Sequence, residues 1–356
     1  MCRQSALMFV ALLLPLLAQA QGDTLRHKTI GNVQVTGRRV GSFMGSSVSG
    51  VSVIDMQMMD LMPRILGNAD PMHYAQLLPG VQTNSEYDAG LHIQGCDNQH
   101  NVTAIEGVPV YNAAHLLGFF SVFNATHFSS FTLHKGTSSA LMPNRLGGMA
   151  DMQMCDTLSH RLRGWVSVGP MSSQATVVVP TSAATQLTFS ARAAYLNLLY
   201  GHWLKMDDEQ MGYSFDDYNL SFRWHPDSRN EVWLDAYTGH DHVGYDDNLH
   251  QYDTNLRWQN QMAALHWNRL LAVGTLRQTA YVTHYANRFS LEEDNLHVLL
   301  PSHVTDYGYK VSLETSSWQA GADVVHHSLQ PQKPDVTGFF NIPKAVVGRQ
   351  EATEAS

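Results

Sequence analysis

Alternation of apolar and polar residues in the second half of the chain most strongly limits what it can fold into. Two segments, 186–195 and 218–225, repeat with a period of two, which is the period of a β-strand. We expect each strand to offer an apolar face to lipid. The apolar positions are Leu187, Phe189, Ala191, Ala193, Tyr195, Tyr218, Leu220, Phe222 and Trp224, and the polar ones are Gln186, Thr188, Ser190, Arg192, Asn219, Ser221, Arg223 and His225.

The spacing of the candidate strands favours an outer-membrane barrel. Long polar connections at 199–214, 241–253 and 289–303 alternate with short ones, which is the usual wiring of such barrels. A soluble β-sandwich is the alternative, but it gives less reason for a long loop at every second connection. The predicted strands cover 162–168, 172–179, 185–198, 215–225, 230–240, 254–268, 274–288, 304–316 and 318–328.

The N-terminus reads as an export signal. Residues 1–20 combine Arg3, the apolar run "ALMFVALLLPLL" and the small-residue cleavage pattern Ala18-Gln19-Ala20. The mature chain then begins at Gln21 and retains two cysteines, which either form one bridge or stay free. A net charge of −9 with only 22 basic residues gives no electrostatic footprint for nucleic acid.

The segment from 30 to 156 has a different texture, with short elements and many turns. Predicted strands are "VQVTG", "GVSVI", "LHIQG", "NVTAIEG" and "SFTLHKG". Helices are predicted over 55–66 and 71–78, the second stopped by Pro79-Gly80. This part therefore predicts a small α+β domain.

Several short motifs follow one another in this domain in a specific order. They are a PGV turn at Pro79 and Gly80, a strand end at Gln94 and Gly95, the sequence Glu106-Gly107-Val108-Pro109, and a strand leading to Lys135 and Gly136. In this order they resemble the plug domain of TonB-dependent outer-membrane receptors. The segment "NVQVTGRR" is similar to the region that holds the TonB box in that family, which we map to Ile30–Thr36 through Ile30, Val33, Val35 and Thr36.

The resemblance implies an α+β plug domain followed by antiparallel transmembrane β-barrel strands. The expected organisation is a signal peptide at 1–20, an N-terminal segment at 21–37, the plug at 38–156, a partial barrel at 157–330 and a polar tail at 331–356. It also implies a receptor rather than an enzyme, with no cofactor. The receptor would sit in outer-membrane lipid and import a scarce siderophore, vitamin, glycan or peptide. Its implied partners are a TonB-type periplasmic protein, which pairs with the TonB box by strand addition, and a candidate surface lipoprotein lid.

The run 106–124 is apolar yet interrupted by glycine and proline. A barrel wall around the plug would bury such loops without regular structure, with Gly118 at a tight turn. Tyr111 to His115 are then a candidate surface toward the substrate. Two positions depart from the family, which usually has Arg where Gln94 stands and Asp where Glu106 stands. The departure predicts a weakened Arg-to-acid pairing and a plug held less firmly.

Histidines offer one more candidate site. His240 and His242 are predicted at the start of an external loop that would bind a metal chelate or a haem-like substrate, although solvated loop positions are the simpler interpretation. His240, His242 and the pair His326-His327 are the obvious metal ligands, but we predict no metal site.

Length sets the alternatives. A barrel that holds a plug has about 22 strands, and this chain has room for about nine. We therefore expect an incomplete barrel from a truncated product, a fragment or half of a split gene. The alternatives are a remnant or signalling receptor that does not transport, and a soluble exported metal-binding β protein.

Overall fold

The computed structural model describes most of the chain from residue 50 onward, within the unit Val40–Ser356. The described ranges are 50–62, 64, 68–83, 90–115, 118–136, 146–202, 205–206, 209–247, 251–338 and 347–356. The predicted signal peptide and the TonB-box region Ile30–Thr36 lie outside them.

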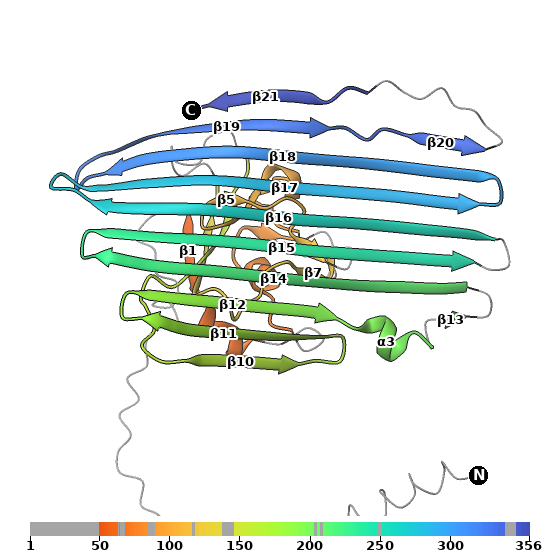
Figure 1. Ribbon diagram of the computed structural model, residues 1–356, viewed down its shortest axis with the longest axis horizontal. Coiled ribbons are helices and arrows are strands. Elements are labelled where there is room, and N and C mark those ends of the chain that lie inside the picture. Colours follow the sequence, from red (N-terminus) through yellow and green to blue (C-terminus); the bar gives the residue numbers. More distant parts are fainter. Residues whose placement is uncertain are drawn as a thin grey trace, which may run out of the picture. The chain divides into compact units, whose positions relative to one another are not determined.

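The plug domain, here the described part of 50–156, lies behind the long strands in Figure 1 and is built on a small mixed sheet in the order β1-β8-β9-β4-β5. The pair β4 and β9 is parallel, and the other pairs are antiparallel. The plug elements are β1 Val51–Asp55, η3 Met56–Leu61, α2 Pro71–Gln76, β2 Val81–Gln82, β3 His92–Ile93, η4 Asn98–His100, β4 Val102–Ile105, β5 Val108–Pro109, β6 Ala114–His115, β7 Phe120–Ser121, β8 Ser130–His134 and β9 Met149–Gln153.

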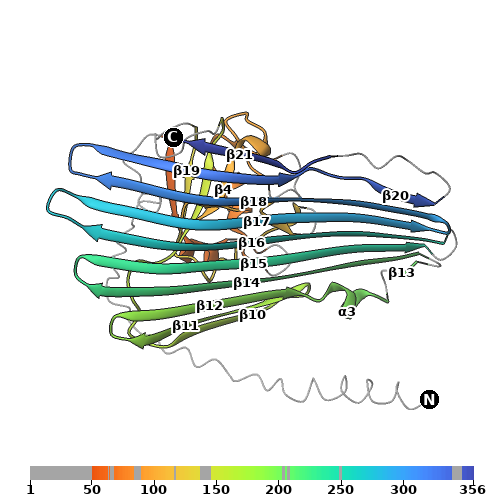
Figure 2. The same ribbon diagram turned by 45° about the horizontal axis from the view of Figure 1, so that its top comes forward.

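The wall is one antiparallel sheet in the order β10-β11-β12-β14-β15-β16-β17-β18-β19-β21, with β13 paired to β14 and β20 to β18 (Figure 2). A short helix, α3 Leu196–Tyr200, follows β12. The wall strands are β10 Arg163–Val168, β11 Ser172–Ser182, β12 Thr185–Ala194, β13 Lys205–Met206, β14 Glu209–Asp227, β15 Asn230–Asp247, β16 Tyr252–Leu270, β17 Thr275–Glu293, β18 Leu296–Glu314, β19 Gln319–Gln330, β20 Asp335–Gly338 and β21 Gln350–Ala355.

The two faces of the wall differ as the alternation predicts. On β14, Arg223 and its polar neighbours at every second position are buried toward the plug, whereas Trp224 points outward and is 44% exposed. Outward residues pair across strands into a continuous apolar row, which is the pattern of a lipid-facing band. That row is Leu187, Phe222, Leu234, Leu265, Ala280, Tyr309 and Val324.

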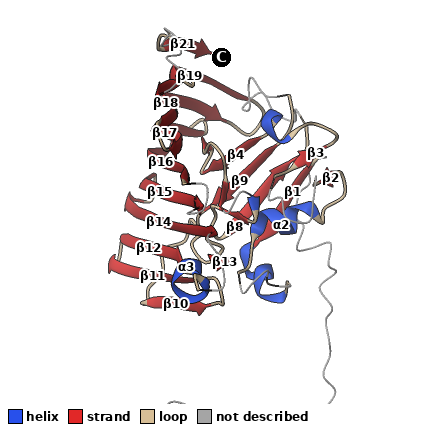
Figure 3. Ribbon diagram, turned by 90° about the vertical axis from the view of Figure 1, so that its right-hand side faces the viewer, coloured by secondary structure: helices blue, strands red, loops and turns tan. Residues whose placement is uncertain are grey.

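The plug lies against the inward face of the wall (Figure 3). Its core is dominated by buried aliphatic and aromatic side chains such as Ile54, Phe131 and Leu133, each at most 1% exposed, and wall residues such as Met262 complete it. The plug and wall therefore share part of one core. Among the described residues, no helix is both long and apolar enough to cross a membrane.

Several predicted boundaries were wrong. Within the helix expected at 55–66, the described residues form a 3₁₀ helix, η3, over Met56–Leu61. It ends before Met62, because the proline that follows Met62 disfavours helical backbone there. The long loops expected at 241–253 and 289–303 are largely strand: β17 and β18 are joined by Asp294 and Asn295, a dipeptide that tolerates left-handed backbone, with Asp294 at φ 38°. Instead of a free polar tail, 331–356 contributes β20 and β21 to the sheet.

Candidate functional site

Three of the sequence motifs meet at one corner of the plug. The backbone N–H of Gln94 donates to the carbonyl of Gly80 at 2.8 Å, and Lys135 Nζ donates to the carbonyl of Pro79 at 2.8 Å. Gly80, Gly95 and Gly136 all have positive φ, which explains glycine at each turn. These hydrogen bonds tie three separate segments of the plug to one another.

The fourth motif forms a tight turn between β4 and β5. Glu106 and Gly107 have φ of 49° and 76°, so both lie in the left-handed region. Within the plug, Asp151 Oδ1 accepts from the backbone N–H of Gly107 at 2.8 Å. Glu106 Oε1 accepts from the backbone N–H of Met154 at 2.6 Å. Hydrogen bonds to β9 and to the residue that follows it therefore hold the turn within the plug, independently of the wall.

Two cations of the wall bind this same turn. Arg223 Nη2 on β14 donates to Glu106 Oε1 at 2.9 Å, and Lys310 Nζ on β18 donates to the carbonyl of Gly107 at 2.9 Å. The expectation that Glu106 weakens Arg-to-acid pairing was therefore wrong. The Glu106 side chain is long enough to reach the wall, and the arginine of the pair, Arg223, belongs to the wall.

Burial shapes the titration of the plug carboxyls at this turn. Burial and the nearby charge of Asp235 raise the pKa of Glu106 to about 8, against the attraction of Arg223. Burial likewise raises the pKa of Asp151 to about 6. Both groups are therefore sensitive to pH in a range where ordinary carboxyls are ionised.

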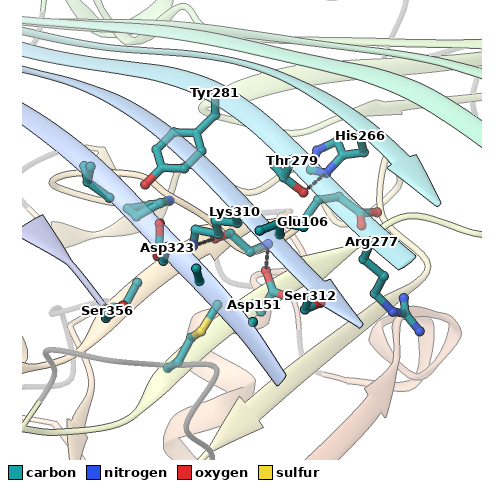
Figure 4. A pocket seen from close by; sticks show the side chains of 18 of the residues that line it. Glu106, Asp151, His266, Arg277, Thr279, Tyr281, Lys310, Ser312, Asp323 and Ser356 are labelled. Carbon is teal, nitrogen blue, oxygen red and sulfur yellow. Dashed lines mark hydrogen bonds and ion pairs between the residues drawn. The ribbon is translucent and has the colours of Figure 1, made fainter. Parts of the chain in front are cut away.

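A cavity of about 890 Å³ lies beside the turn, between the plug and strands β15 to β19 (Figure 4). Glu106, Asp151 and Lys310 line it together with His266 and Tyr281. Lys310 Nζ also lies 3.7 Å from Asp323 Oδ2 and 5.4 Å from the centre of the Tyr281 ring. The lining of the cavity mixes apolar side chains with charged groups of both signs.

A second contact centres on His115, which is 1% exposed. Its Nδ1 lies 2.7 Å from Asp241 Oδ2, and its Nε2 lies 3.3 Å from Asp217 Oδ2. The ring stacks on Phe215 with centroids 4.4 Å apart. Burial disfavours the imidazolium, but the carboxylates of Asp217 and Asp241 outweigh burial and raise the pKa of His115. The two wall carboxylates therefore favour the protonated form of this plug histidine.

The same wall carboxylates connect His115 to the N-terminus of α2. Arg192 Nε donates to Asp217 Oδ2 at 2.6 Å, and Arg192 Nη2 donates to the carbonyl of Ser121 at 2.7 Å. The backbone N–H of Ser121 donates to Asp70 Oδ2 at 2.6 Å, and Asp70 caps α2. Burial acts to raise the pKa of Asp70, but His73 and Ser121 lower it overall. Buried polar groups thus run from the wall into the plug without a break.

Further polar contacts join plug and wall. The hydroxyl of Tyr111 donates to Asp306 on β18. His127 Nδ1 lies 2.7 Å from Ser190 Oγ, and its Nε2 lies 3.2 Å from Ser221 Oγ. Burial lowers the pKa of His127 to about 3, so this histidine is neutral. Gly118, with φ 115°, makes the predicted tight turn between β6 and β7.

The predicted histidine loop is a strand. His240 and His242 lie within β15, not in a loop, and alternate with the buried Asp241 on the face away from the plug. Their partners are Asp216 Oδ2 at 3.1 Å and Asn255 Oδ1 at 2.7 Å. Over the described ranges, no group of three or more His, Cys, Asp and Glu side chains is arranged to hold a metal ion. Cys96 and Cys155 are both free thiols.

Sequence reasoning expected Tyr111 to His115 to face the substrate and did not identify wall partners for them. In the structure, Tyr111 and His115 contact carboxylates of the wall. Arg192 and Arg223 were on the polar faces of the alternating strands. A charged side chain on the inward face of such a strand is a signal for a buried partner. Asp217, Asp241 and Lys310 gave no comparable signal, because acidic and basic residues also occur in exposed strand ends.

Comparison with known proteins shows the fold. No protein-family model matches the sequence, and neither does any curated protein. The outer membrane transporter YddB from Escherichia coli superimposes with a TM-score of 0.61 and 11% identity, over 85% of this chain and 53% of that chain. The ferric yersiniabactin uptake receptor FyuA from Yersinia pestis gives a TM-score of 0.54 and 11% identity, over 86% of this chain and 60% of that one.

A variant of the ferric enterobactin receptor PfeA from Pseudomonas aeruginosa also gives a TM-score of 0.54, with 13% identity over 86% of this chain and 54% of the receptor. The chain thus spans little more than half the length of these structures. It has the fold of TonB-dependent outer-membrane receptors, with a plug domain and part of the β-barrel.

Proposed function

We propose that this chain is the plug and part of the wall of an outer-membrane receptor that imports a scarce substrate with energy from a TonB-type periplasmic protein. The fold and the outward apolar row support a place in the outer membrane. The structural neighbours are receptors and transporters, which supports a receptor over an enzyme.

One observation carries the proposal: hydrogen bonds and ion pairs join plug and wall at several points beside the apolar core that they share. Arg223 binds Glu106, Lys310 binds Gly107, and His115 lies between two wall carboxylates. Water can replace such contacts at modest net cost when a domain shifts, whereas separating an extensive apolar interface exposes it to water. A plug held in this way is suited to being pulled aside and returning.

The proposed energy input acts at Ile30–Thr36. A segment rich in β-branched residues near the N-terminus of the mature chain is suited to adding a strand to a partner sheet. The test is the affinity of a purified TonB-type periplasmic domain for the full chain in detergent. Val35→Pro removes a backbone donor and should weaken binding at least tenfold, whereas Val35→Thr keeps the strand propensity and should bind as the wild type does. Equal binding by both variants would contradict the proposed partner.

Localisation is tested separately. Envelope fractions probed with an antibody to residues 241–253 should show the chain in the outer membrane. Recovery only in the soluble periplasmic fraction would overturn the proposal. The mass of the native polypeptide should also be compared with the 39.6 kDa of this sequence. A larger mass would mean that the native protein has further barrel strands.

A further inference from the structure

The plug contains two buried histidines that contact the same wall strands in opposite chemical settings. His115 and His127 are 1% and 6% exposed, and both reach β14. Carboxylates face both ring nitrogens of His115, whereas serine hydroxyls face both ring nitrogens of His127. The two sites therefore differ in how strongly they favour a protonated ring.

We propose that docking of the plug onto the wall takes up one proton at His115, so that displacement of the plug releases it. The contact of the plug hairpin β6–β7 with Asp217 and Asp241 of the wall would then weaken as pH rises. This inference goes beyond the proposed uptake function and requires neither a TonB partner nor a substrate.

The geometry at His115 explains why the proton is needed. With both nitrogens protonated, the ring donates to Asp241 from Nδ1 and faces Asp217 with Nε2. A neutral ring would present one lone pair to a carboxylate within 3.3 Å or less, which is repulsive in a buried site. A glycine of the wall, Gly239, stands beside this ring, and a side chain at that position would clash with the hydroxyl of Tyr237.

The charged and titratable groups around the ring come from every element packed against it. Arg192 projects from β12, Asp217 and Tyr213 from β14, and Asp241 and Tyr237 from β15, while Asp70 joins from the plug through Ser121. The positive charge of Arg192 acts to lower the pKa of His115. Arg192 donates to Asp217, however, whereas Asp241 is hydrogen-bonded to the His115 ring. Asp217 and Asp241 thus face Arg192 and the His115 ring, while Asp70 lies beside His73.

The sign of the pH dependence follows from linkage. An undocked, hydrated histidine titrates near 6.5, and the docked His115 titrates above that value. Docking is therefore strongest below pH 6.5 and weakens as pH rises through the docked pKa. Between the two values, the equilibrium constant for release rises tenfold per pH unit for one proton.

The test uses the full chain in detergent and hydrogen exchange of the peptide 113–122. The protection factor, with the intrinsic pH dependence of exchange divided out, reports opening of the hairpin. Wild-type protection should fall more steeply from pH 6.5 upward than that of His115→Gln, with a difference of up to tenfold per pH unit. His127→Gln is the matched control and should keep the wild-type slope. Glu106 and Asp151 titrate in all three proteins and cancel in the comparison.

Equal slopes in the wild type and His115→Gln would overturn the proposal. If His115→Gln does not fold, Asp241→Asn in the wall provides the second test. Removal of one carboxylate should move the pH at which protection is lost toward 6.5, and an unchanged pH would also overturn it.

Discussion

Arg223 and Lys310 lie in the same cross-strand row of the wall, one on β14 and the other on β18, and donate to adjacent residues of one plug turn. Consecutive pairings connect them through Trp233, His266 and Thr279. The Glu106–Gly107 turn is therefore held from two sides by a single row of inward-facing residues.

Loss of the Arg223 contact should destabilise the plug. Arg223→Met keeps much of the side-chain volume but removes the charged donor to Glu106, so we expect a loss of about 1.5–3 kcal/mol in the free energy of unfolding. The free energy of unfolding is measured by urea unfolding, with proteolysis of the plug as the probe of the unfolded fraction. Arg277→Met is the control, because the Arg277–Glu314 pair is about half exposed and should contribute under about 1 kcal/mol. A loss no larger than the control would contradict the role of this contact.

Asp151 should make the plug less stable as pH rises. Its pKa is raised from 3.8 to about 6 by burial, so the folded plug is favoured below pH 3.8 and this advantage is lost as pH rises through 6. Asp151→Asn retains an oxygen that accepts from Gly107 and avoids the buried charge. We expect a higher melting temperature than the wild type at pH 7 and a smaller difference at pH 4. A lower melting temperature for Asp151→Asn at pH 7 would contradict this assignment.

Gly239 should be intolerant of a side chain. A methyl group there would clash with the hydroxyl of Tyr237 and contact the His115 ring, so Gly239→Ala should cost about 1–3 kcal/mol through overpacking. Gly244→Ala on the same strand meets its nearest neighbour at 3.5 Å, an ordinary contact, and serves as control. Thermal unfolding of both variants in detergent measures the difference. If Gly244→Ala proves the more damaging, the packing around His115 is not as described.

A charge in the outward apolar row should impair membrane insertion. Leu234 lies within that row, so Leu234→Lys should disfavour insertion by about 2–4 kcal/mol if the row lies near the bilayer midplane. His240→Lys adds the same charge to the same face of β15 beside Asp216 and should be tolerated. The fraction of heat-modifiable protein after refolding into lipid vesicles reports insertion. Equal insertion of the two variants would show that this row does not face lipid.

The alternation of residues was enough to predict the two faces of the wall. Side chains on a strand point alternately to opposite sides, so the polar set with Arg192 and Arg223 had to face inward once the apolar set faced lipid. Strand ends could not be predicted in this way. Asp246 and Asp253 look like loop residues, yet they are paired across β15 and β16, because an antiparallel ladder continues as long as its backbone hydrogen bonds do.

The sequence by itself determined the order of plug and wall, the turn at Glu106 and Gly107, and the two faces of the alternating segments 186–195 and 218–225. These features depend on local backbone preference and on a period of two, both of which are properties of short segments. Only the tertiary structure decided that Arg223 and Lys310 bind one turn, and that carboxylates face His115 while serine hydroxyls face His127. Those outcomes depend on the register between strands that are far apart in the chain. They also depend on which polar groups folding brings within hydrogen-bond distance in a buried site.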